Sequence, residues 1–100
     1  MKMSKTVRKL NDKLVGALKK LSDFANEEVT GFAHLDHIVQ FDLFPGSLVV
    51  TCYFEDLTAL DTKATKKVLQ KKLQSLLLKQ GIVLKDVKQN LILAANESQS

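Results

Sequence analysis

The chain is poor in the residues on which small proteins rely for covalent cross-links or membrane insertion. Its 100 residues include one cysteine, Cys52, so an intramolecular disulfide cannot form. A lone thiol is typical of reducing compartments. No apolar run approaches the roughly 20 residues that span a bilayer, and no apolar segment of the secretory kind follows the charged N-terminus. We therefore expect a cytoplasmic protein without a membrane partner.

Glycine is scarce too, and recognisable catalytic motifs are missing. The four glycines fall at predicted helix or turn positions, which leaves no Gly-rich phosphate loop. Neither a G-x-S-x-G motif, nor a repeated cysteine pair, nor a pair of carboxylates on one recognisable element is present. The sequence thus predicts no enzymatic activity, no cofactor and no small-molecule substrate.

Two histidines and the cysteine are the remaining candidates for chemistry. A cysteine beside a histidine can act as a nucleophile, and the same residues with an acid could hold zinc. However, His34 and His37 lie three apart in a predicted strand and so point to opposite faces. Cys52 lies among Val, Phe and Leu, where a thiol behaves as a small hydrophobic group. Structural roles are therefore predicted for all three, with a metal or redox site as the distant alternative.

Length and composition indicate one globular domain covering residues 1–100. Apolar residues make up 45% and charged residues 26%, which is ordinary for a soluble domain. A chain of this size has a thin core and no room for a second one. The final residues, 96–100, are polar and are expected to fray.

Residues 4–28 have a clear helical period. Ser4 is a plausible N-cap, and the following apolar residues recur at spacings of three and four: Val7, Leu10, Leu14, Ala17, Leu18, Leu21, Phe24 and Ala25. The opposite side is basic. The pattern favours a helix that faces the core, and a short heptad seam is the alternative.

An antiparallel hairpin is predicted from strands 34–43 and 48–55. Odd positions of the first strand and even positions of the second are apolar, so they share one face. Pairing Leu43 with Leu48 places Phe41 opposite Val50 and leaves a four-residue loop, 44–47, that accommodates Pro45. Phe44 is then expected in the loop, partly exposed.

A second helix is predicted from Asp61 or Thr62 to Gln80, with the preceding stretch DLTALD, 56–61, as a short turn or a separate helical piece. Asp61 can cap its start, and Gly81 can end it in the left-handed conformation. A last strand follows at 91–95, and 83–87 is a possible additional short strand. The expected architecture is α+β, in the order α-β-β-α-β, with two basic amphipathic helices on one face of the sheet.

The other sheet face is expected to carry Ile38, Val49 and Tyr53 among polar neighbours. This surface is more apolar than a solvated sheet needs, which suggests a homodimer or protein interface. A homodimeric interaction or structural domain is accordingly one of the two functions considered.

Basic charge is the most informative feature. Fifteen Lys and Arg face eleven Asp and Glu, and seven of the positive charges fall within the first twenty residues. Such clusters bind phosphate backbones, or are simply a solvated surface. Arg8 is the only arginine, which disfavours sequence-specific DNA readout. The leading hypothesis is a non-enzymatic module that binds RNA, the ribosome or the nucleoid through Lys5, Arg8, Lys9, Lys13, Lys63, Lys66, Lys67, Lys71 and Lys72.

The stretch GFAHLDHIVQFDLFPGSLVVTCYFED resembles the middle of a family of small gammaproteobacterial proteins sometimes labelled Fis-like regulators. The resemblance rests on Phe32, Leu35 and His37, then on Phe44, Pro45, Ser47 and Leu48. Fis-type DNA binding needs a C-terminal helix-turn-helix, whereas this chain is expected to end in a strand. The element order is also similar to ribosome-binding factor A and other type II KH-like domains. That similarity implies RNA binding, although the Gly-x-x-Gly loop of KH domains is missing.

Overall fold

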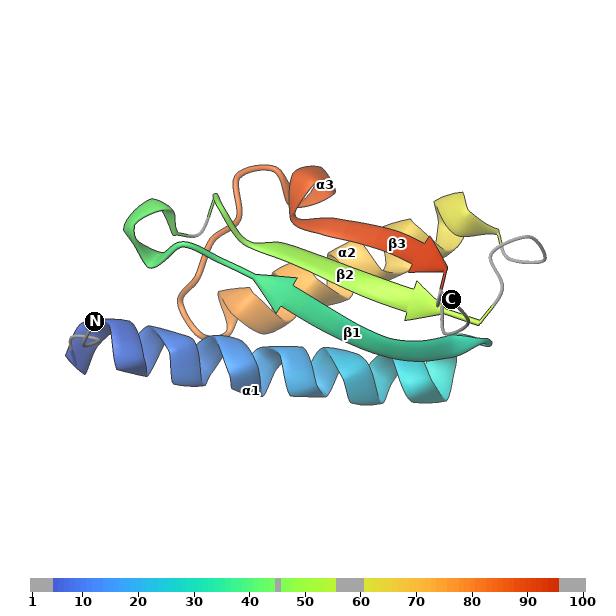
Figure 1. Ribbon diagram of the computed structural model, residues 1–100, viewed down its shortest axis with the longest axis horizontal. Helices are drawn as coiled ribbons and strands as arrows, with labels where there is room; N and C mark the ends of the chain where they lie inside the picture. Colours follow the sequence, from blue (N-terminus) through green and yellow to red (C-terminus); the bar gives the residue numbers. More distant parts are fainter. Residues whose placement is uncertain (1–4, 45, 56–60, 96–100) are drawn as a thin grey trace, which may run out of the picture.

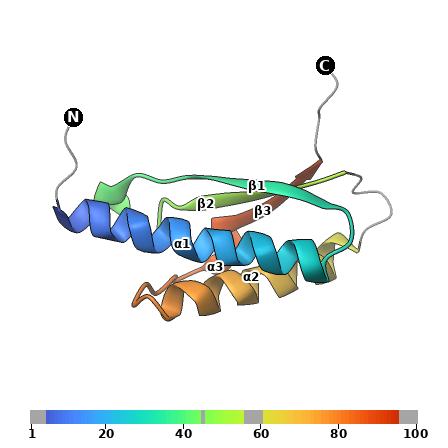
Figure 2. The ribbon, with the colours of Figure 1, turned by 90° about the horizontal axis from the view of Figure 1, so that it is seen from below.

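The structure, a computed structural model, describes residues 5–44, 46–55 and 61–95. Its elements follow the predicted order α-β-β-α-β and form two layers, with both long helices on one face of a three-stranded sheet (Figures 1 and 2). The α+β architecture is thus confirmed. The elements are α1 (Lys5–Glu28), β1 (Phe32–Ile38), a 3-10 turn η1 (Phe41–Leu43), β2 (Val49–Phe54), α2 (Thr62–Leu78), a short helix α3 (Val87–Asn90) and β3 (Leu91–Ala95).

The sheet is mixed, and β2 is its central strand. β1 pairs with β2 antiparallel, whereas β3 pairs with the other side of β2 in parallel. The parallel pairing follows from the connection, because α2 carries the chain back along the length of the sheet before β3 begins. β1 and β3 are therefore the two edge strands, and β3 starts at the predicted residue, Leu91.

The predicted hairpin register is wrong, although the faces are right. Val50 lies opposite His37 instead of Phe41, and Ile38 lies opposite Val49. The strands consequently stop at Ile38 and resume at Val49, so the predicted four-residue loop is in fact a long connection over 39–48. Because the slip is by an even number of residues, every strand residue keeps its predicted face.

A side chain in the long connection explains the slip. The Ser47 hydroxyl donates to the Gln40 carbonyl over 2.8 Å and accepts from the Gln40 N–H over 2.9 Å. It thereby occupies the backbone groups that a longer strand would have paired. Leu43, predicted to pair with Leu48, lies in η1 and is 60% exposed, whereas Leu48 is fully buried. Phe44 is half-buried in the loop, as expected.

The core lies between the sheet and the two long helices. α1 contributes Leu14, Leu18 and Leu21, which confirms that this helix faces the core. The largest fully buried side chain is Phe54 of β2, whose ring meets that of Phe32 edge-to-face at 5.8 Å. Each such side chain contributes about 1.5–3 kcal/mol on burial.

Both ends of α2 have the predicted caps. The Asp61 carboxylate accepts from the Ala64 N–H over 3.1 Å. At the other end, the N–H groups of Gly81 and Ile82 donate to the carbonyls of Leu78 and Leu77, the pair of bonds found in a Schellman motif. Gly81 has φ +80°, as that motif requires. The predictions for Ser4, 56–60 and 96–100 lie outside the described residues.

The segment after Gly81 is not the additional strand considered at 83–87. Ile82 and Leu84 are buried and Val83 is 64% exposed, so the alternation is genuine, but no strand pairs with this segment. It closes the end of the core instead and leads to α3. There the buried Asn90 donates its Nδ2 to the Leu48 carbonyl over 2.7 Å, which ties the start of β3 to the start of β2.

Candidate nucleic-acid interface

Five lysine side chains gather around one hollow between α2 and α3. The hollow has a volume of about 420 Å³ and is lined by these lysines together with Gln70 and Val87. In the part of the chain that the structure describes, no aspartate or glutamate lines it. We call these residues the lysine cluster: Lys63, Lys66, Lys67, Lys71 and Lys88.

The cluster follows from helix geometry. Residues four apart on a helix lie on one stripe, which brings Lys63, Lys67 and Lys71 together. Lys66 lies beside them and is half-buried. Lys63 and Lys66 also line a second hollow of about 440 Å³ with Ile92 and Leu93 of β3. The cluster thus extends from α3 to the free edge of the sheet.

Sequence reasoning missed Lys88, because α3 was not predicted. The signal was Asp86, whose carboxylate accepts from the Lys88 N–H over 3.2 Å and so caps this short helix. An aspartate followed by polar residues and a strand is a common helix start, but four residues are too few to show a period.

Among the described residues, no carboxylate forms an ion pair with a lysine of the cluster. The aspartates next to it in the chain, Asp61 and Asp86, each accept a backbone N–H at a helix start. Within residues 5–44, 46–55 and 61–95, the one basic nitrogen within 4.0 Å of a carboxylate oxygen is His34 Nε2, which lies 3.9 Å from Asp36 Oδ2, and no lysine makes such a contact. The ammonium groups are therefore available to an anion.

Lys72, predicted as part of the same site, lies on the other flank of α2. Its Nζ sits 5.0 Å from the centre of the Phe24 ring, a cation–π contact with α1. It lines a separate hollow between the helices with Lys20, Lys79 and Glu27. Lys72 therefore has a structural partner in α1 and is not part of the lysine cluster.

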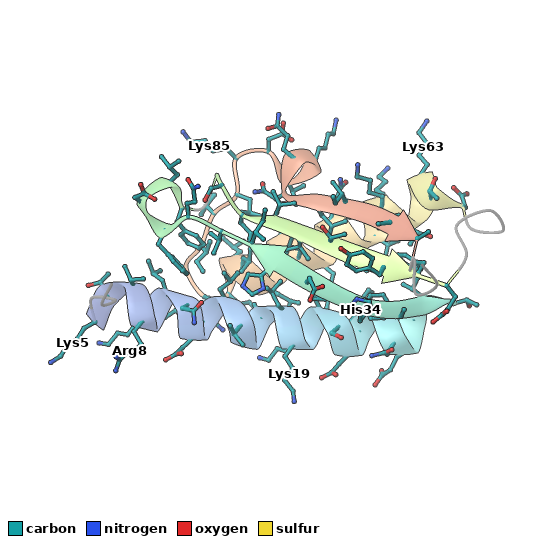
Figure 3. All side chains as sticks on the ribbon, in the orientation of Figure 1. Lys5, Arg8, Lys19, His34, Lys63 and Lys85 are labelled. Atoms are coloured by element: carbon teal, nitrogen blue, oxygen red, sulfur yellow. The ribbon has the colours of Figure 1, made fainter. Side chains whose placement is uncertain are left out.

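Two of the predicted basic residues of α1, Lys5 and Arg8, lie on another side of the molecule from the lysine cluster. Lys5, Arg8 and Lys19 project from the outer side of α1, whereas Lys63 and Lys85 project from the opposite edge (Figure 3). Lys9 and Lys13 are also exposed residues of α1. The cause is packing: α1 contacts β1, and α2 contacts β3, so their outer faces diverge. The nine predicted residues do not form one surface.

The charges at the ends of α1 oppose its dipole. The first turn holds Lys5 and Arg8 with no acid, and the last turn holds Glu27 and Glu28 with no base. Each charge placed this way costs about 0.3–1 kcal/mol when it is exposed. These positions therefore do not serve helix stability.

The predicted interface residues share the open face of the sheet. Ile38 and Val49 pair across β1 and β2, and Ile38 is 70% exposed. Two further residues of this face were not among the predicted interface residues. Ile92 of β3 is 41% exposed, and the His34 ring stacks on the Tyr53 ring with centres 4.6 Å apart and planes inclined by 17°.

Cys52 and His37 lie on the same face of the sheet, one pair apart, as predicted. Cys52 is fully buried, and this burial raises the pKa of its thiol to about 12, so it stays protonated near neutral pH. His34 points to the opposite face. Within the described ranges no group of three metal-ligating side chains comes together.

Similarity to known proteins supplies no family for this chain. A scan against protein-family models, a search of curated proteins and a search of solved structures each find no match. Of the helices in the described residues, none is both long and apolar enough to span a bilayer.

Proposed function

We propose that the protein is a small, non-enzymatic module that binds the phosphate backbone of RNA through the lysine cluster of α2 and α3. One observation carries the proposal: among the described residues, five lysines and no carboxylate line a single hollow. Bringing five like charges together is unfavourable in the free protein, and an anionic backbone relieves this repulsion.

The residue type favours backbone binding over base reading. Lysine contacts phosphate as a point charge, whereas arginine supplies the bidentate geometry that reads guanine. The cluster contains no arginine. We therefore expect little sequence preference, as for a protein bound to the ribosome or to other structured RNA. DNA of the nucleoid presents the same phosphates and is the comparison in the binding assay.

The salt dependence of RNA binding tests the proposal. Five contacts to a single strand predict a slope of about −3.5 in a plot of log K against log salt. The measurement is fluorescence anisotropy of a labelled RNA at several salt concentrations. Binding with a slope near zero would contradict the proposal.

Paired variants locate the site. Lys67→Gln with Lys71→Gln removes two charges from the cluster. The slope of log K against log salt should become shallower by about 1.4, and affinity should drop at low salt. The matched control is Lys5→Gln with Lys19→Gln, which removes the same charge from the outer side of α1 (Figure 3). Equal losses in both double variants would mean a diffuse charge effect. If the native protein does not bind RNA, the lysines are a solvated surface whose charge keeps the β3 edge from pairing with other strands.

The open sheet face supports a second candidate function, self-association, because Ile38 is 70% exposed there beside Val49. Light scattering at high protein concentration tests it directly. A dimer whose formation is lost in Ile38→Lys would establish this function, whereas a strictly monomeric mass would remove it.

A further inference from the structure

Tyr53 is the single tyrosine of the chain and belongs to the open face of the sheet. One side of its ring is occupied, because the His34 ring of β1 stacks on it at 4.6 Å and 17°. His34 belongs to β1, so the strand on the other flank of Tyr53 is the third strand, β3.

The residue of β3 opposite Tyr53 is Ala94. Its methyl group is short, so it leaves the space above it open beside the tyrosine ring. Neighbouring strands lie about 4.8 Å apart, and stacked aromatic planes need slightly less. A flat aromatic ring placed above Ala94 would extend the stack from His34 through Tyr53 to a third member.

Beyond Ala94 the sheet ends, and the lysine cluster begins. Lys63 and Lys66 border the β3 edge and share a hollow of about 440 Å³ with Ile92 and Leu93. Ile92 also presents apolar surface on the open face, where it is 41% exposed. Across β3 the surface therefore passes from the position beside Tyr53 to a hollow that Lys63 and Lys66 line.

This juxtaposition matches a nucleotide unit, which has an aromatic base at one end and a phosphate at the other. We infer that the protein takes single-stranded nucleic acid along the β3 edge, with one base stacked on Tyr53 above Ala94 and the adjoining phosphates on Lys63 and Lys66. The inference rests on the proposed function and sharpens it. A duplex keeps its bases paired and stacked on one another, so it can use the lysines but not the tyrosine.

Size argues against a second copy of the chain as the occupant of this face. Three strands and five residues of length present a footprint of about 240 Å², estimated from strand spacing and rise. Stable interfaces bury about 800 Å² on each partner. A sheet-to-sheet contact of this area would be weak by itself.

The sole tyrosine makes the inference directly measurable, since the chain has no tryptophan. Tyrosine fluorescence of the native protein is titrated with an unlabelled eight-nucleotide single strand, with a duplex of the same length, with inorganic polyphosphate and with a mononucleotide. We expect quenching by the single strand and little by the duplex or by polyphosphate, even where both bind.

Three variants give the affinity side of the test, measured by anisotropy with a labelled single strand. Tyr53→Leu removes the stacking surface, and Ala94→Leu fills the space beside the ring, so each should weaken binding roughly tenfold. Tyr53→Phe keeps an aromatic face and should bind like the native protein. Circular dichroism confirms that each variant folds, and polyphosphate affinity should be unchanged in all three.

The outcomes separate the two proposals. Lysine-dependent binding of the single strand without quenching, and with native affinity in Tyr53→Leu, overturns the stacking site and leaves the proposed function standing. Failure of every anion to bind overturns both. If a mononucleotide binds as tightly as the single-stranded nucleic acid, the ligand is a free nucleotide, and the inference of a bound single strand is overturned. A dimer that dissociates in Tyr53→Leu assigns the face to a second copy and overturns the inference.

Discussion

Raising the pH from about 8 to about 10 should destabilise the fold by about 1.4 kcal/mol through Cys52 alone. Burial raises the pKa of the folded thiol from 9.0 to about 12. Below pH 9.0 the folded and unfolded chains both keep the proton, and the contribution of Cys52 is fully present. Between the two pKa values only the unfolded chain ionises, so the free energy of unfolding falls by about 1.4 kcal/mol per pH unit.

The assay is urea unfolding followed by far-UV circular dichroism at the two pH values. Cys52→Ala is the control, because it lacks the thiol while every other titrating group remains. The difference in unfolding free energy between the native protein and Cys52→Ala should therefore shrink by about 1.4 kcal/mol at the higher pH. A difference that stays constant would refute the reasoning, as would rapid modification of Cys52 by a thiol reagent in the native state.

Three further substitutions test other parts of the structure by urea unfolding. Asn90→Ala leaves the buried Leu48 carbonyl without its 2.7 Å donor and should cost about 2 kcal/mol; a loss below about 0.5 kcal/mol would mean that water replaces the amide. Gly81→Ala should cost about 1 kcal/mol because Gly81 has φ +80°, while Gly81→Asn should cost less. Lys5→Glu should stabilise the protein by about 0.5 kcal/mol, since it reverses a charge that opposes the dipole of α1; a destabilised variant would contradict this account.

The two long helices, α1 and α2, could be predicted from the sequence because their signals are local. The spacing of Leu14, Leu18 and Leu21 defines one buried stripe, and Asp61 and Gly81 mark the ends of α2 by their own chemistry. Each of these signals lies within a few residues of the structure that it specifies. Tertiary packing therefore had little opportunity to override them.

The hairpin register could not be predicted in the same way. Alternation along a strand repeats every two residues, so a slip by any even number preserves the buried and exposed faces. The register depends instead on the paired hydrogen bonds between Ser47 and Gln40 and on η1. A hydropathy pattern does not show that a serine hydroxyl will form hydrogen bonds with the backbone of a distant residue, so it cannot predict this register.

The candidate site was predictable only in part, for a related reason. The stripe of Lys63, Lys67 and Lys71 follows from the helical period alone. The separation of Lys72 from this stripe depends on where Phe24 of the neighbouring helix lies. The His34–Tyr53 stack depends in turn on the hairpin register. Both are facts of packing between segments that are distant in the sequence.

The parallel pairing of β3 with the central strand has a consequence for how the chain acquires its fold. During synthesis α1 and the β1–β2 hairpin are complete before β3 is made. Until then, the N–H and C=O groups on one side of β2 have no strand to pair with. That pairing must also bring together segments on either side of α2, which makes it a slow, non-local step. A nascent chain that stalls before Leu91 would present an open strand edge to its neighbours and would be prone to aggregate.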